Sequence, residues 1–129
     1  MKNTEELLEQ EALVQYLELK KIKYSALIQD TPAGHHESGS WRPAYNTLRK
    51  NKRLGICKGV PDLMCILKKK NGYTVLLFIE MKKKKGGVVS KEQKEWGNEL
   101  NKIEGVFAIV SNGAGEAINF IDNFIKINI

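Results

Sequence analysis

Residues 59–82 read GVPDLMCILKKKNGYTVLLFIEMK. Two apolar runs, Asp62–Leu67 and Tyr73–Glu80, flank a lysine-rich segment whose Asn71-Gly72 pair is a typical β-turn signal. The stretch therefore predicts a β-hairpin. In a hairpin the start of one strand lies beside the end of the other, so we expect Asp62 and Glu80 to meet at one end of a sheet.

Outward from the hairpin, apolar spacing and turn residues predict the remaining elements. In chain order they are a helix over 4–20, a strand over 24–28, a long loop over 31–45, a short basic helix over 44–54, a loop over 82–89, a helix over 90–103, a strand over 106–110, a turn over 112–115 and a helix over 115–127. Ser90 and Gln93 have the spacing of a capping box. A strand-helix-strand crossover after a hairpin predicts a mixed β-sheet flanked by helices, an α/β fold. Residues 1–129 form a single domain in this interpretation.

The chain carries a formal charge of +6, with an isoelectric point near 9.3. Basic residues cluster at 49–53, 68–70 and 82–85, a pattern that suits a polyanionic partner, although a solvated surface explains any single cluster equally well. No apolar run is long enough to span a bilayer, and acidic residues interrupt the first helix where a signal peptide would be apolar. We expect a cytoplasmic protein. Cys57 and Cys65 match no zinc or disulfide framework.

Asp62, Glu80 and Lys82 carry the chemistry of this sequence. Two carboxylates can hold Mg²⁺, and a nearby ammonium can orient a water molecule or stabilise developing negative charge. Glu80 and Lys82 stand two apart on an extended segment, so their side chains share a face. The alternative for Glu80 and Lys82 alone is a strand that ends where a lysine-rich loop enters water.

Gly59-Val60-Pro61-Asp62, Glu80-Met81-Lys82 and Gln93 together resemble the VRR-NUC family of the PD-(D/E)xK nuclease superfamily. The resemblance extends over most of the chain and implies a restriction-endonuclease-like α/β core. It also implies a metal-binding glutamate in the first helix. That residue is Glu6, accompanied by Gln10, with Glu9 and Glu11 as nearby competitors.

The resemblance implies a role for each matching residue. Asp62 and Glu80 would bind Mg²⁺ or Mn²⁺, Glu6 would complete the set, and the Met81 main-chain carbonyl would supply a further oxygen. Lys82 would position the attacking water and stabilise the transition state. Gln93 would hold Lys82 or a phosphate oxygen, or would serve only as the capping-box partner of Ser90.

By the same resemblance the protein is a metal-dependent DNA endonuclease, structure-selective in the manner of Holliday-junction resolvases, of a phage-associated type that acts as a homodimer. One rival is a non-catalytic nucleic-acid-binding module that uses the basic clusters. Another is a nucleotide-binding protein that uses the turn at 111–115, although this turn lacks the glycine spacing and lysine of known phosphate-binding loops.

We expect nucleic acid to contact basic residues near the loops: Arg42, Arg49, Arg53, Lys58, Lys83 and Lys84. Trp41 and Tyr45 would either stack on bases or pin the long loop to the core. In the same loop, Ala33 departs from the family pattern, where an asparagine is usual. His35 and His36 are interpreted as exposed loop residues, because a hard oxygen site has little need of histidine.

Overall fold

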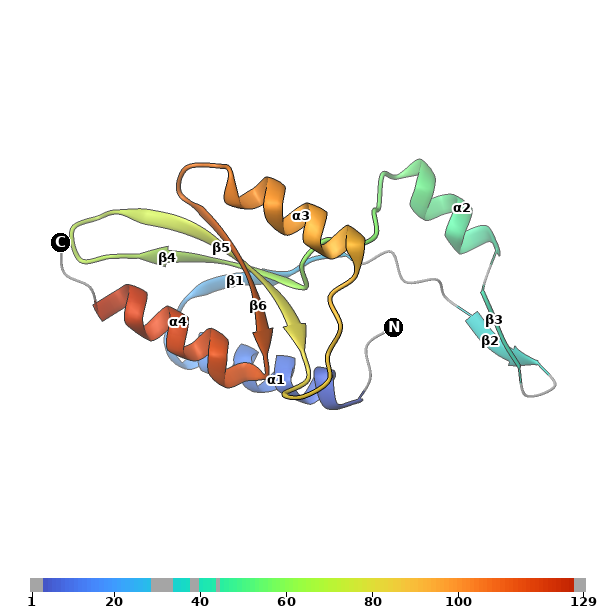
Figure 1. Cartoon of the computed structure of the whole chain (residues 1–129), viewed down its shortest axis with the longest axis horizontal. Helices are drawn as coiled ribbons and strands as arrows, with labels where there is room; N and C mark the ends of the chain where they lie inside the picture. Colours follow the sequence, from blue (N-terminus) through green and yellow to red (C-terminus); the bar gives the residue numbers. More distant parts are fainter. Residues whose placement is uncertain (1–3, 29–33, 38–39, 44, 127–129) are drawn as a thin grey trace.

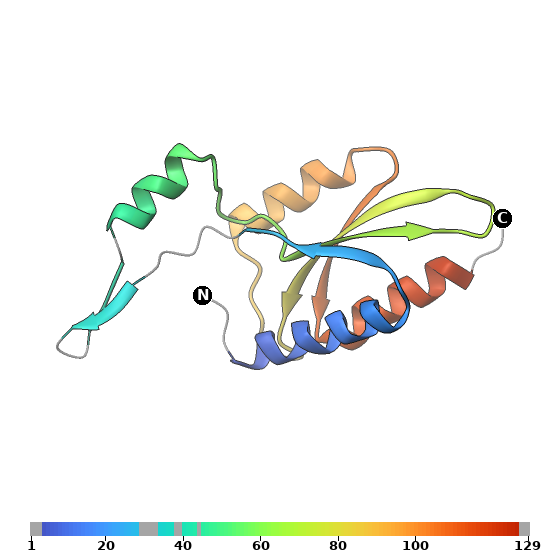
Figure 2. The same ribbon diagram turned by 180° about the vertical axis from the view of Figure 1, so that it is seen from behind.

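The computed structural model describes residues 4–28, 34–37, 40–43 and 45–126; where these fall between 34 and 48 it describes the backbone alone. Its elements are α1 (Thr4–Leu19), β1 (Lys23–Ala26), β2 (Gly34–Glu37), β3 (Ser40–Pro43), α2 (Tyr45–Arg53), β4 (Leu63–Lys68), β5 (Thr74–Lys82), α3 (Lys91–Asn101), β6 (Val106–Asn112) and α4 (Ala114–Lys126). Figures 1 and 2 show them from opposite sides.

The expected hairpin is present as β4 and β5, paired antiparallel from Leu63↔Ile79 to Lys68↔Thr74. Its turn contains Gly72 at φ +88°, a conformation that glycine adopts without a Cβ clash. β1 pairs antiparallel with β4, and β6 pairs parallel with β5, giving the order β1-β4-β5-β6. The prediction of a mixed sheet flanked by helices is confirmed.

One face of the sheet forms the core with α1 and α4, which pack side by side beneath it (Figure 1). Alternate residues of β4 and β5 point into this layer and are buried, as the period of two in a strand requires. The buried set is Leu13, Leu17, Leu63, Cys65, Leu67, Val75, Leu77, Ile79, Met81, Ala114, Ala117, Ile121 and Phe124. α3 lies on the other side of the sheet and packs against β6.

The structure corrects two predictions. The segment expected to be a loop over 31–45 contains β2 and β3, which pair from Gly34↔Pro43 to Glu37↔Ser40. Backbone hydrogen bonds alone can join such short strands, and their sequences, GHHE and SWRP, lack the apolar alternation that signals a strand. Residues 31–33, with the Ala33 position, lie outside the described residues. β2, β3 and α2 stand off one end of the sheet (Figure 2).

The second correction concerns strand length. β5 continues to Lys82 and β6 to Asn112, because the two strands stay paired as far as Lys82↔Asn112. Lys82 was expected to open a loop, but it is the last residue of a central strand. Within the part of the chain that the structure describes, no helix has both the length and the apolar content needed to cross a membrane.

Candidate active site

Asp62 is held at the entrance of β4 by its backbone and its side chain. Its N–H donates to the Ile79 carbonyl at 3.0 Å, and its own carbonyl accepts from the N–H of Leu27 at 2.9 Å. Carboxylate oxygen Oδ2 accepts from the N–H of Met81 at 2.7 Å, and the residue is 5% exposed. The carboxylate is therefore fixed beside the end of β5, as the hairpin predicted.

Glu80 and Lys82 lie at that end of β5 and are equally enclosed, with 5% and 7% exposed. Lys82 Nζ lies 3.4 Å from Glu80 Oε2, so the two side chains share a face as their spacing predicted. The Lys82 carbonyl accepts from the N–H of Gly113 at 2.8 Å, which joins the strand end to the turn after β6. Burial of such charged groups is unfavourable unless they are paired, and here they are.

Gln93 links the start of α3 to this site. Its Oε1 accepts from the Ser90 N–H at 2.8 Å and its N–H donates to Ser90 Oγ at 3.1 Å, which confirms the capping box. Its Nε2 donates to Glu80 Oε2 at 3.0 Å. The side-chain amide of Gln93 therefore caps α3 with its oxygen and bonds to the candidate site with its nitrogen. In this structure Gln93 contacts Glu80, whereas the sequence suggested Lys82 or a phosphate.

Two glycines let backbone approach the site closely. A Cβ on Gly59, at φ +88°, would lie 2.5 Å from the carbonyl carbon of Glu92, so this glycine allows the strand entrance to touch α3. A Cβ on Gly87 would lie 2.8 Å from Lys82 Cβ and 3.4 Å from its Cγ. Gly87 therefore packs on the base of the Lys82 side chain. This contact was not predicted from the sequence, in which the Gly-Gly pair at 86–87 is its signal.

The glutamates of α1 have different surroundings. Glu9 Oε1 accepts from the N–H of Ala114 at 2.8 Å and so caps α4, which gives Glu9 a structural role. Glu11 is exposed, while Glu6 and Gln10 are half-buried. No three His, Cys, Asp or Glu side chains of the described residues lie close enough together to hold a metal ion. Glu6 as a third ligand stays a prediction.

The donor set at the strand ends nevertheless suits a divalent cation. Two buried carboxylates and one ammonium leave an excess negative charge, and oxygen donors are the ligands that Mg²⁺ and Mn²⁺ prefer. The Ile79 carbonyl accepts from the Asp62 N–H, and the Met81 N–H donates to the Asp62 carboxylate. Odd-numbered residues of β5 therefore direct their backbone polar groups toward β4. The Met81 carbonyl thus faces the Asp62 side, where its proposed role requires it.

Two backbone amides in the first turn of α4 are already bonded within the chain. Ala114 N–H is bonded to Glu9, and Ala117 N–H donates to Ser111 Oγ at 2.9 Å. A phosphate-binding helix N-terminus offers such amides to its ligand. The plain-turn interpretation of 111–115 therefore accounts for the structure better than a nucleotide site.

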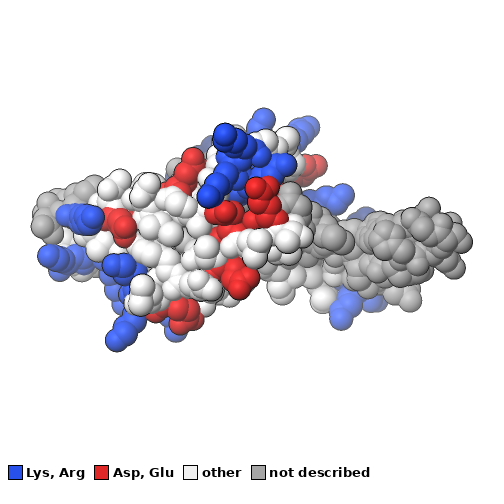
Figure 3. Space-filling view, turned by 90° about the horizontal axis from the view of Figure 1, so that it is seen from below, with Lys and Arg blue, Asp and Glu red and all other residues white. Residues whose placement is uncertain are grey.

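The basic residues predicted to contact nucleic acid occupy different settings. Arg49, Arg53, Lys58 and Lys84 are exposed and Lys83 is half-buried, whereas the Arg42 side chain, like those of His35, His36, Trp41 and Tyr45, lies outside the described side chains. Lys58 lines a cavity of about 280 Å³ with Glu92, Glu95, Trp96 and Glu99, so acids surround it. On the face shown in Figure 3, basic side chains gather beside a smaller acidic group.

Comparison with known proteins gave consistent results. A family model described as "VRR-NUC domain" matches residues 4–115. A solved structure described as "VRR_NUC domain protein" is 25% identical, with a TM-score of 0.63, and the match covers 99% of this chain and 93% of that one. Among curated proteins, none matched the sequence.

Proposed function

Because the chain belongs to the VRR-NUC nuclease family, we propose that it is an endonuclease that hydrolyses DNA phosphodiester bonds at Asp62, Glu80 and Lys82 with Mg²⁺ or Mn²⁺ as cofactor. The observation that carries this proposal is the burial of these three charged side chains at one end of a hairpin, with Lys82 Nζ 3.4 Å from Glu80 Oε2. A strand that merely ended in water would leave them exposed.

Each residue of the site has its own role in this proposal. Asp62, Glu80 and the Met81 carbonyl would hold the cation, with Glu6 as a further donor. When bound, the cation acidifies water and neutralises phosphate charge. Lys82 holds the attacking water by hydrogen bonding and offsets the negative charge that grows on the phosphate oxygens. Gln93 keeps Glu80 oriented through the bond at 3.0 Å.

A branched substrate such as a Holliday junction and a homodimeric state complete the proposal. Both rest on the family resemblance and on the basic composition, with its net charge of +6. Two copies of the site would match the symmetry of a four-way junction. Size-exclusion chromatography with light scattering, with and without junction DNA, measures the oligomeric state directly.

The decisive experiment compares wild type with Asp62→Asn and Glu80→Gln on labelled junction, flap, single-stranded and duplex DNA, with Mn²⁺ or with EDTA. We expect wild type to cleave only with Mn²⁺ and each variant to lose at least about a hundred-fold in rate. Glu95→Gln, which changes an exposed acid of α3, is the matched control and should cleave normally.

The rival function is DNA binding without catalysis, favoured by the exposed basic residues at 49–53 and 84–85. It predicts that wild type binds DNA but cleaves none of the four substrates in the presence of Mn²⁺. That outcome would refute the nuclease proposal.

A further inference from the structure

The end of the sheet opposite Asp62 holds a second group of charged residues. A cavity of about 290 Å³ lies where β1 begins and β4 ends, and four lysines surround it: Lys20, Lys21, Lys23 and Lys68. We call it the lysine pocket. Its floor is apolar and includes Ile66 and Ile125, which are half-buried. All four lysines are exposed, so their ammonium groups are accessible to a ligand.

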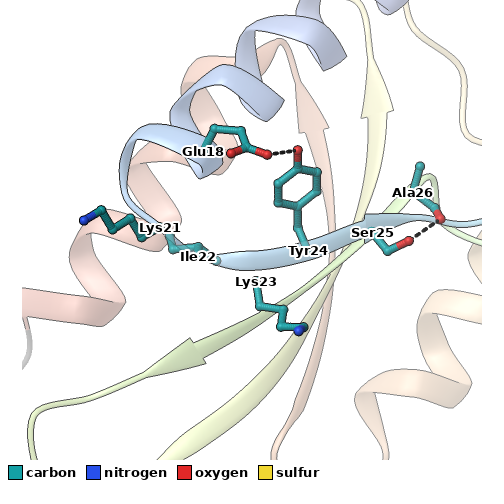
Figure 4. Close-up of a pocket in the computed structure, with 7 residues that line it drawn as sticks. All are labelled: Glu18, Lys21, Ile22, Lys23, Tyr24, Ser25 and Ala26. Carbon is teal, nitrogen blue, oxygen red and sulfur yellow. Dashed lines mark hydrogen bonds between the residues drawn. The ribbon is translucent and has the colours of Figure 1, made fainter.

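In the part of the chain that the structure describes, Glu18 and Asp122 bond to tyrosine hydroxyls and form no ion pair with these four lysines. Glu18 accepts a hydrogen bond from the Tyr24 hydroxyl at 2.6 Å, and Asp122 accepts one from Tyr16. Figure 4 shows Glu18 and Tyr24 pointing toward each other on one side of β1, with Lys23 on the other side. Among the described residues, ion pairs join Lys82 to Glu80 and Lys102 to Glu99, and none involves a lysine of the pocket.

Lys21 occupies a backbone conformation that the fold alone would assign to glycine. It has φ 58°, and no other non-glycine residue in the described part of the chain has a positive φ. Its N–H donates to the Glu18 carbonyl and the N–H of Ile22 donates to that of Leu17, the Schellman pattern that ends a helix. Glycine is the usual residue at this position because it has no Cβ penalty.

A lysine at this position therefore strains the backbone, and a local benefit does not account for it. Positive charge favours the C-terminus of α1, but Lys20 supplies that charge without leaving the usual backbone regions. Lys21 lines the lysine pocket and also the neighbouring open cavity of about 670 Å³ drawn in Figure 4. The position of a strained residue beside two cavities points to a function of its side chain.

We propose that the lysine pocket binds a phosphate group of the DNA backbone, at a position separate from the site of hydrolysis. This inference rests on the proposed function, because it takes DNA as the ligand. Clustered ammonium groups attract phosphate, and the apolar floor suits the sugar that accompanies it.

The spacing within β4 agrees with one DNA molecule that reaches both sites. The six residues of β4 rise about 3.3 Å each, so Asp62 at one end and Lys68 at the other are roughly 17 to 20 Å apart. A duplex advances about 3.4 Å per base pair, so five or six base pairs cover that distance. The lysine pocket would then hold DNA about half a helical turn from the bond that is cut.

The test measures binding of a fluorescent 20-base-pair duplex and of a labelled junction in EDTA, at several salt concentrations. The variants are Lys21→Gly, Lys21→Gln and the double variant Lys23→Gln/Lys68→Gln. Lys102→Gln is the matched control, since Lys102 is an exposed lysine that pairs with Glu99. We expect the double variant to bind roughly three- to ten-fold more weakly, with a salt slope lower by up to about 0.9 per lost phosphate contact.

Lys21→Gly separates a binding role from a structural one. Glycine relieves the positive φ, so the melting temperature of this variant should equal or exceed that of wild type while its DNA binding weakens. Lys21→Gln keeps the strain and removes the charge, so it should weaken binding to the same extent without a gain in stability. If Lys21 only supported the fold, both variants would bind as wild type does.

The inference is overturned if the double variant and both Lys21 variants match Lys102→Gln in affinity and salt slope, or if wild type binds no DNA. If the pocket variants match Lys102→Gln and wild type still cleaves DNA with Mn²⁺, the lysine pocket is refuted while the proposed function stands. The converse result, weaker binding by the pocket variants but no cleavage by wild type, would support the lysine pocket and refute the nuclease.

Discussion

The two ends of the β4–β5 hairpin carry charge in opposite ways. At one end Asp62, Glu80 and Lys82 are 5–7% exposed, and each is bonded or ion-paired to a neighbour of fixed position. At the other end Lys68, the last residue of β4, and Lys70, in the turn that follows, are exposed. Charges in a buried, hydrogen-bonded setting interact strongly and hold one geometry, whereas exposed charges are screened and act through their summed field. The first arrangement suits catalysis and the second suits attraction of a polyanion.

This comparison predicts that changes around the buried end alter the rate of cleavage at saturating DNA, even without touching a charge. Gly87→Ala is the strongest such change. The new methyl group would lie 2.8 Å from Lys82 Cβ, which the strand backbone fixes, so the loop or Lys82 must move. We expect the single-turnover rate to fall between about ten- and a hundred-fold, as for a catalytic group displaced by up to 1 Å.

Gly97→Ala is the control for this change, because a Cβ at that position has no atom within 4 Å. It should leave the cleavage rate unchanged and stabilise α3 slightly. Equal rates for Gly87→Ala and wild type would show that the position of Lys82 does not limit the reaction. The expected link between fixed geometry at the buried end and the cleavage rate would then be wrong.

A smaller effect separates the two functions of Gln93. Ser90→Ala and Gln93→Ala each disrupt the capping box, so each should lower the free energy of unfolding by about 1 kcal/mol. Only Gln93→Ala also removes the donor to Glu80 Oε2. Denaturant titration should therefore give similar stabilities, while the cleavage rate falls about ten-fold for Gln93→Ala alone. A parallel loss of rate in both variants would instead assign Gln93 to the cap.

The smallest effect concerns the thiols, which repeat the contrast between buried and exposed groups. Burial raises the pKa of Cys65 from 9.0 to about 12, whereas Cys57 is exposed. The unfolded thiol ionises first as pH rises, so the stability from neutral Cys65 is complete below pH 9 and is lost between pH 9 and 12. Unfolding titrations of wild type and Cys65→Ala should differ less as pH rises through this range.

A thiol reagent gives a direct readout of the same contrast. At pH 8 it should label Cys57 in the native protein and Cys65 only after unfolding. Rapid native labelling of Cys65 would show that this part of the core opens readily.

The sequence predicted the parts of the fold that apolar patterns specify. The run Val75–Ile79 between the Asn71-Gly72 turn and Glu80 indicated the central hairpin, and Ser90 with Gln93 indicated the start of α3. β2 and β3 were missed because their residues lack apolar alternation. The pairing of β5 with β6 out to Lys82 was also missed, because a lysine-rich sequence resembles a loop until a parallel neighbour supplies its hydrogen bonds.

For the candidate site, the sequence indicated which residues meet but not how they are held. Asp62 and Glu80 followed from hairpin geometry. The bond from Gln93 to Glu80, the packing of Gly87 on Lys82 and the cap that Glu9 provides for α4 depend on distances between elements, which no spacing along the chain encodes. The last of these gives Glu9 a structural contact, while the choice of metal ligand among Glu6, Glu9 and Glu11 stays a prediction.

The bond between the Lys82 carbonyl and the N–H of Gly113 has a consequence for the order of assembly. β5 carries two residues of the site, yet its parallel partner β6 is synthesised some twenty residues later. Glu9, near the start of the chain, likewise cannot form its bond to Ala114 until that residue has been synthesised. Contacts so distant along the chain form late in folding. We therefore expect a nascent chain that lacks β6 and α4 to contain Asp62, Glu80 and Lys82 without holding them together. Such a chain would not cleave nucleic acid during translation. A fragment ending at residue 104 should be digested rapidly by proteases and should cleave no DNA.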